Sequence, residues 1–155
     1  MKEFSGNLDA SGMKIAVVVS RFNSFFTEQL VKGALDCFVR HGGDEANLAL
    51  VRVPGANEIP LAVSRLAKAK KGWNAIVAVG AVIRGATPHA DLINQQVSRS
   101  LAAIGLETGI PVLNGIICAD TIEQAVERAG TKAGNKGWDA AQAAIEMASL
   151  FRALP

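Results

Sequence analysis

Four apolar runs of strand length, separated by helical patterns, constrain the fold of this chain more than any other feature. They span residues 14–19, 48–53, 75–83 and 112–118. The third run is apolar or glycine at every position, which is typical of a strand buried on both faces of a parallel sheet. Because parallel strands need right-handed helical crossovers, the alternation predicts a three-layer α/β sandwich with a four-stranded parallel sheet.

Helical patterns fill the intervals between the runs. The first follows a cap at Asn23 or Ser24 and stops at His41-Gly42-Gly43. A short helix starts at Thr121, where the capping-box spacing occurs, and ends at Arg128-Ala129-Gly130. The others cover residues 57 to about 70, about 91 to 108, and about 138 to 154. With 155 residues, the chain (1–155) is expected to form a single domain.

Composition argues against several classes of function. The net charge is +2, the basic residues are scattered, and aromatic residues make up only 5%, so nucleic-acid binding is not expected. No apolar run approaches the ~20 residues of a spanning helix, and the first residues lack a signal-peptide core, so no membrane role is expected. Cys37 and Cys118 lack metal-ligand spacing, which predicts reduced thiols in a cytoplasmic protein without a metal.

Residues able to do chemistry follow three of the apolar runs. The segments are Ser20-Arg21-Phe22-Asn23, Pro54-Gly55-Ala56-Asn57-Glu58, and Arg84 to His89. The carboxyl ends of parallel strands share one edge, where open α/β sheets bind ligands, so an aromatic ring, a carboxylate and an imidazole should meet there. Structural roles stay open at this point: Phe22 as core, Glu58 as a partner of the helix dipole, and His89 as a helix cap.

A second unusual string runs from Glu127 to Gly137 and reads ERAGTKAGNKG. Glycines beside hydroxyl and cationic side chains suit an anion, because backbone N–H groups approach closely and an arginine pairs with two oxygens. The string is not a Walker loop, and no GxGxxG follows the first run, which argues against a dinucleotide site. The alternative is a turn between two helices with solvated lysines.

Together these strings resemble the lumazine synthase family of riboflavin biosynthesis, over essentially the whole chain and in the right order. The strings that carry the resemblance are SRFN (20–23), VPG (53–55) with EIP (58–60), GAVIRGATPH (80–89), EQA (123–125), ERAGTKAGNKG (127–137) and EM (146–147). The resemblance implies a flavodoxin-like fold. It also implies the penultimate step of riboflavin biosynthesis, in which 5-amino-6-(D-ribitylamino)uracil and 3,4-dihydroxy-2-butanone 4-phosphate condense to 6,7-dimethyl-8-ribityllumazine. The family uses no cofactor and no metal.

The resemblance also implies roles for individual side chains. Phe22 stacks on the pyrimidine, Asn57 (mainly through its backbone) and Glu58 hold the ribityl hydroxyls, and His89 shuttles protons. Val82 and Ile83 line the pocket, and Ala86 and Thr87 contact the phosphate. Asn114, in the fourth run, is a further implied substrate contact. Arg128 pairs with the phosphate and Lys136 reaches the uracil, both from a neighbouring subunit.

Assembly follows from the same resemblance. Members of the family form homopentamers, and many build a 60-subunit icosahedral shell. The turn between Gly130 and Gly137 resembles that of shell-forming members. The N-terminal segment, residues 1–8, is expected to add a strand to the sheet of the adjacent subunit.

The chain departs from the family pattern where large rings are common. Asn57, Ala90 and Asn114 stand at three such positions. Loss of a buried ring costs ~3–5 kcal/mol when nothing fills the space, so either a gap or repacking is expected. This leaves a rival interpretation, an assembly-competent protein of the family with weakened catalysis.

Overall fold

The computed structural model describes residues 1–155 and contains the predicted parallel sheet. Its strands are β1 (Ile15–Ser20), β2 (Leu48–Val53), β3 (Ala75–Ile83) and β4 (Val112–Ala119). They lie in the order β2-β1-β3-β4, and every neighbouring pair is parallel. The predicted strands 48–53 and 75–83 are confirmed residue for residue, whereas β1 and β4 each end one residue later than predicted.

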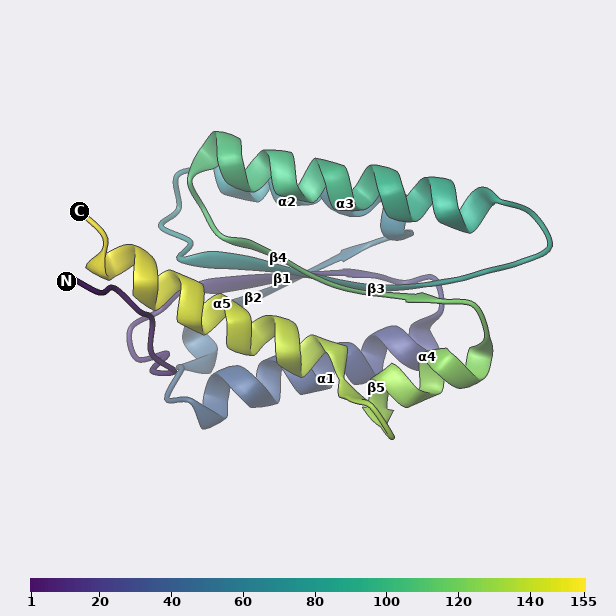
Figure 1. Cartoon of the computed structure of the whole chain (residues 1–155), viewed down its shortest axis with the longest axis horizontal. Helices are drawn as coiled ribbons and strands as arrows, with labels where there is room; N and C mark the ends of the chain where they lie inside the picture. Colours follow the sequence, from purple (N-terminus) through teal and green to yellow (C-terminus); the bar gives the residue numbers. More distant parts are fainter.

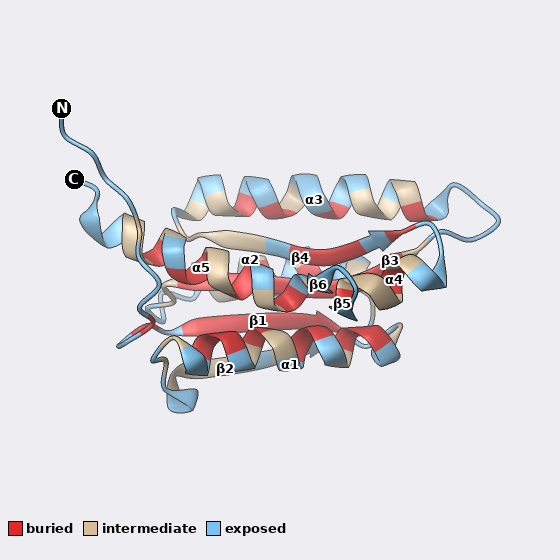
Figure 2. Ribbon diagram, turned by 60° about the horizontal axis from the view of Figure 1, so that its bottom comes forward, coloured by how far each residue is buried: buried red, intermediate tan, exposed pale blue.

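Two layers of helices cover the sheet (Figure 1). One face carries α1 (Ser24–Arg40), α4 (Ile122–Arg128) and α5 (Lys136–Ala153), and the other carries α2 (Ile59–Lys68) and α3 (His89–Thr108). The buried sides of α1 and α3 face the strands (Figure 2). Each face has its own apolar core, so the predicted three-layer sandwich is confirmed. None of its helices has the length and hydrophobicity to span a bilayer.

The helix ends lie near the predicted positions, but neither the positions nor the caps agree with the predictions at every end. Thr121 caps α4, because its hydroxyl accepts from the backbone N–H of Gln124 at 3.1 Å. The Gln124 side chain accepts from Asp120, one residue before the cap, so only half of a capping box forms. The second predicted helix starts later than expected: a 3₁₀ turn, η2 (Ala56–Glu58), precedes α2.

The glycine-rich string between α4 and α5 folds as a small antiparallel hairpin rather than a simple turn. Its strands are β5 (Ala129–Thr131) and β6 (Gly134–Asn135). Asn135 then caps α5, accepting from the N–H groups of Gly137 and Trp138. A Cβ on Gly137 would overlap the carbonyl of Leu30, so glycine is needed for α5 to pack against α1. Part of the string therefore has a packing role.

The residues before β1 form no strand within the chain. Asn7 contacts α5, where its N–H donates to the hydroxyl of Ser149 at 3.0 Å. Phe4 and Leu8 remain 38% and 43% exposed, as predicted for a segment without a strand partner in its own chain. The two cysteines are free, and Cys37 is fully buried on α1 as expected. Burial raises the pKa of the Cys37 thiol to about 11.

Candidate active site

A cavity of about 400 Å³ lies at the carboxyl edge of the sheet, where the sequence predicted a site. The three segments that follow β1, β2 and β3 all contribute to its wall. Seven of the predicted site residues line it: Phe22, Asn57, Glu58, Val82, Ile83, Thr87 and His89. Ala86 lies between two lining residues, Gly85 and Thr87, but does not itself line the cavity. Ala90, one of the departures from the family pattern, is also part of the wall.

The turn after β1 presents Phe22 to this cavity. Asn23 adopts a left-handed conformation (φ 63°), and its side-chain amide donates to the carbonyl of Ala81 at 2.8 Å. Asn23 therefore occupies the N-cap position of α1 without making the predicted side-chain cap. The Phe22 N–H donates to the carbonyl of Pro54 at 3.1 Å, which extends the pairing of the first two strands. With its backbone fixed and its side chain 72% exposed, Phe22 offers a face for a planar ligand rather than serving as core.

The turn after β2 brings Asn57 and Glu58 to the opposite wall. Both lie in η2, which begins after Gly55, and the N–H of Glu58 donates to the Gly55 carbonyl at 3.2 Å. Glu58 also directly precedes α2, where the helix dipole favours a negative charge. Both side chains are exposed, so their amide and carboxylate oxygens remain available to hydroxyl groups of a ligand.

The third wall is the loop from β3 to α3. Residues 84–88 are exposed, and α3 begins at His89 itself. The helix cap is Pro88, which supplies no side-chain hydrogen bond, so His89 is not the cap that one interpretation of the sequence allowed. The His89 side chain is exposed and lines the cavity, so its ring nitrogens are accessible to a bound molecule.

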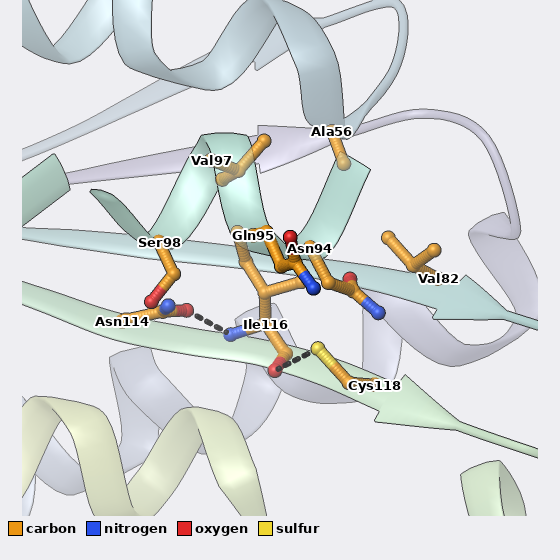
Figure 3. A pocket seen from close by; sticks show the side chains of 9 residues that line it. All are labelled: Ala56, Val82, Asn94, Gln95, Val97, Ser98, Asn114, Ile116 and Cys118. Atoms are coloured by element: carbon orange, nitrogen blue, oxygen red, sulfur yellow. Dashed lines mark hydrogen bonds between the residues drawn. The ribbon is translucent and has the colours of Figure 1, made fainter. Parts of the chain in front are cut away.

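A second cavity of about 300 Å³ adjoins the first between α3 and β4, and Figure 3 shows its lining. Ala56 and Val82 belong to both walls. Asn114, the remaining predicted residue of the fourth run, lies here rather than beside His89. Its amide oxygen accepts from the N–H of Ile116 at 3.0 Å. Space is thus present where the family commonly has a ring.

Sequence reasoning missed three polar side chains of this second cavity, Asn94, Gln95 and Ser98. All three lie on α3, and the amide oxygen of Asn94 is buried without a hydrogen-bond partner. Their position in the sequence could have indicated this, because they flank Ile93 and Val97. These two residues belong to the apolar stripe that packs on the sheet, so the polar side chains next to them lie at the edge of the helix–sheet contact.

Arg128 and Lys136 line neither cavity. Arg128 donates to the carbonyl of Cys118 at 3.4 Å, on the outer edge of the sheet. Partial burial raises the pKa of the Cys118 thiol, while the positive charges of Lys136 and then Arg128 act in the opposite direction. The two predicted cations therefore lie near Cys118 of β4. No group of three or more His, Cys, Asp and Glu side chains lies close enough to hold a metal ion.

The fold and this cavity define a class: small three-layer α/β enzymes that bind small molecules at the carboxyl edge of a parallel sheet. Comparison with known proteins gives the family. The model of the 6,7-dimethyl-8-ribityllumazine synthase family matches residues 12–152, and the chain belongs to this family.

Two curated relatives agree with this assignment, and both carry the name 6,7-dimethyl-8-ribityllumazine synthase. The protein of Chloroherpeton thalassium is 53% identical over 152 residues, which cover 98% of this chain and 97% of the relative. The protein of Aquifex aeolicus is 54% identical over 154 residues, covering 99% of each chain. The resemblance stated from the sequence strings is thereby confirmed.

Proposed function

We propose that this chain condenses 5-amino-6-(D-ribitylamino)uracil with 3,4-dihydroxy-2-butanone 4-phosphate, releasing phosphate and water to give 6,7-dimethyl-8-ribityllumazine. Family membership carries the assignment of the reaction. The observation that supports it in this chain is the meeting of an aromatic ring, a carboxylate and an imidazole, those of Phe22, Glu58 and His89, on one cavity. At about 400 Å³, that cavity falls within the usual range of small-molecule sites.

The pyrimidine substrate binds between the first two walls. Phe22 stacks on the planar ring, because its own ring is exposed and its backbone is fixed by two hydrogen-bonded strands. Asn57 and Glu58 accept hydrogen bonds from the ribityl hydroxyls, while Val82 and Ile83 cover the apolar side of the ring.

The phosphate-bearing substrate binds at the loop before α3. Ala86 and Thr87 contact the phosphate through a backbone N–H and a hydroxyl, and the start of α3 favours the negative charge. His89 then lies next to both substrates. Its imidazole takes and returns the protons of Schiff-base formation and phosphate elimination, because an imidazole nitrogen can both accept and donate a proton. Holding the two substrates in register supplies much of the remaining rate.

The second half of the site comes from another copy of the chain. Arg128 and Lys136 line neither of the two cavities described above, and in this proposal they reach the phosphate and the uracil of a neighbouring subunit. A homopentamer provides that neighbour, and twelve pentamers form a 60-subunit shell. Several large apolar side chains support association, since they are exposed on the single chain: Phe25 (76%), Leu61 (78%) and Leu106 (88%).

Light scattering tests the assembly. The expected mass is that of a shell, formed when the segment 1–8 adds a strand to the adjacent subunit and covers an open sheet edge. A lone pentamer would refute the shell and keep the shared site. A monomer in dilute buffer would refute both.

The enzyme is preferred over an assembly protein with weakened catalysis because the cavity retains the ring, the carboxylate and the imidazole. Mixing the purified protein with both substrates and recording lumazine fluorescence decides between them. Product formation at a steady rate supports the enzyme, and an assembled protein without product supports the rival.

We also assign the chain to the cytoplasm, since two unpaired cysteines suit a reducing compartment; cell fractionation tests this.

A further inference from the structure

One cation and two carboxylates connect three elements beside the loop that leads to His89, where they line a separate small cavity of about 190 Å³, and the proposed chemistry uses none of them. Arg84 directly follows β3; its Nη2 donates to Asp91 at 2.7 Å and its Nε donates to Asp120 at 3.1 Å. Asp91 lies in the first turn of α3, and Asp120 directly follows β4. The backbone N–H of Arg84 also donates to the carbonyl of Ala119 at 2.8 Å. A single residue thus joins the ends of two strands to the start of a helix.

The loop that borders this cluster has little else to hold it. Gly85, Ala86 and Thr87 are exposed, and their backbone groups take part in none of the turn and loop hydrogen bonds. The next contact is the carbonyl of Pro88, which accepts from the N–H of Asp91. The path from β3 to His89 is therefore fixed at its two ends, and Arg84 connects those ends through Asp91.

We propose that Arg84 is a positioning residue, which holds the start of α3 and the 85–88 loop so that His89 and the phosphate contacts keep their geometry. The inference rests on the proposed roles of His89, Ala86 and Thr87. The planar guanidinium fixes the directions of its donors, so one side chain can hold carboxylates on two different elements. Asp91 is two residues from His89 on the same helical turn, so a shift of Asp91 moves the imidazole with it.

The burial of the cluster separates this role from a contribution to folding. The side chains of Arg84, Asp91 and Asp120 are 50%, 43% and 66% exposed. Ion pairs this exposed contribute little to stability, so their loss is expected to leave the fold intact. A displacement of a reacting group by about 1 Å, in contrast, costs roughly 10²-fold in rate. The cluster thus has more effect on turnover than on stability.

The first test is independent of activity. Backbone hydrogen exchange is measured on the assembled wild type, on Arg84→Met and on the matched control Arg40→Met. Arg40 also holds a carboxylate, that of Asp36 on α1, at 2.9 Å. Amides of residues 85–92 are expected to exchange faster in Arg84→Met only. Unchanged exchange in that segment, or equal change in both variants, overturns the proposal even if the wild type has no lumazine synthase activity.

The second test uses the reaction. Arg84→Met is expected to lower kcat by roughly 10–100-fold and to raise the KM of the butanone phosphate, because both effects depend on the loop. The KM of the pyrimidine substrate should not change, since Phe22 and Glu58 hold it from other segments. Arg84→Lys should not restore kcat, because an ammonium group lacks the fork. A parallel rise of both KM values with kcat unchanged would overturn the positioning role.

The two carboxylates separate positioning from direct contact with the phosphate. Asp91→Asn and Asp120→Asn should each reproduce part of the loss of kcat, and combining either with Arg84→Met should add little, because the three residues act as one unit. Full activity in both aspartate variants would mean that Arg84 acts on the phosphate itself, and would overturn the proposal. An inactive wild type would refute the proposed function instead.

Discussion

The two segments that stand out in the sequence, the loop before α3 and the hairpin before α5, differ in what a single chain can do with them. The loop ends at His89 on a cavity that two other segments of the same chain complete. The hairpin follows Arg128 and leads into Lys136, and both cations lie beside the edge strand β4 without lining either of the two cavities. In our proposal the first segment forms a site within the chain, and the second is a half-site that needs another copy.

The two segments are therefore explained by different features of the structure. Strand topology alone explains the loop, because the carboxyl ends of β1, β2 and β3 meet at one edge. Part of the hairpin is explained by packing instead, since Asn135 caps α5 and Gly137 allows α5 to approach α1. Packing does not explain why Arg128 and Lys136 are present. The predictions below test whether those two cations belong to the chemistry.

The largest effect is expected at the loop. Replacing His89 with alanine should slow turnover by roughly 10–10⁴-fold and leave folding intact, the range allowing for partial replacement of the imidazole by water. Steady-state lumazine fluorescence measures the rate. His41→Gln is the matched control, because the only other histidine lies at the end of α1, with its ring 5.9 Å from that of Trp138. Undiminished turnover in His89→Ala would remove His89 from the mechanism.

The hairpin should show a smaller and more selective effect. Arg128→Ala should raise the KM of the phosphate-bearing substrate by about 10–100-fold, because charged hydrogen bonds to phosphate contribute ~1.5–3 kcal/mol. Separate titration of each substrate measures it. Equal losses for both substrates would indicate a structural arginine.

Mixing variants tests whether the half-sites come from different copies. Subunits carrying His89→Ala and subunits carrying Arg128→Ala are unfolded together, refolded and assayed. Shared sites predict activity above that of either variant alone, because some interfaces then combine an intact His89 with an intact Arg128. No gain on mixing, with both variants assembled, would place the two residues in one subunit's site.

The fold was largely predictable from the sequence because its signals are local and redundant. The run 75–83 is apolar or glycine throughout and buried at eight of its nine positions, which is typical of a central strand in a parallel sheet. Residues of the cavity wall followed from strand ends. Less predictable were contacts between segments distant in the chain, such as the amide of Asn23 on Ala81, which replaces the expected cap of α1.

The lining of the second cavity was also difficult to predict from the sequence. Its polar lining on α3 depends on how α3 packs against β4, a relation between two elements that no periodicity within either one reveals. Asn114 was assigned to the site by resemblance, yet its cavity is separate from that of His89 and adjoins it only through Ala56 and Val82. Residues of an edge strand are difficult to assign because their partner can be another chain.

Asn114 therefore gives a third test, with a modest effect. Asn114→Phe restores a ring beside the second cavity of about 300 Å³. If that space is a gap of the site, substrate analogues should bind several-fold more tightly, as measured by calorimetry. If the neighbouring copy already fills it, the added ring is expected to destabilise by about 1–3 kcal/mol, since overfilling a packed site is unfavourable. Thermal denaturation distinguishes the two outcomes, and no change in either measurement would exclude Asn114 from site and interface alike.

The smallest effect is expected in the reactivity of Cys118 near the hairpin, which can be measured without substrate. Burial raises the pKa of Cys118, and the positive charge of Lys136 partly offsets this by favouring the thiolate. Removing that charge in Lys136→Ala should raise the pKa further, so that less thiolate is present at a given pH below it. Since the thiolate is the nucleophile, labelling of Cys118 by a maleimide at pH 8 should slow by about two-fold. Lys132→Ala, which removes an exposed cation at the hairpin tip, serves as the control and should leave the rate unchanged. Equal slowing in both variants would mean that the hairpin acts as a diffuse positive surface. The charge of Lys136 would then give no evidence that the hairpin forms a half-site.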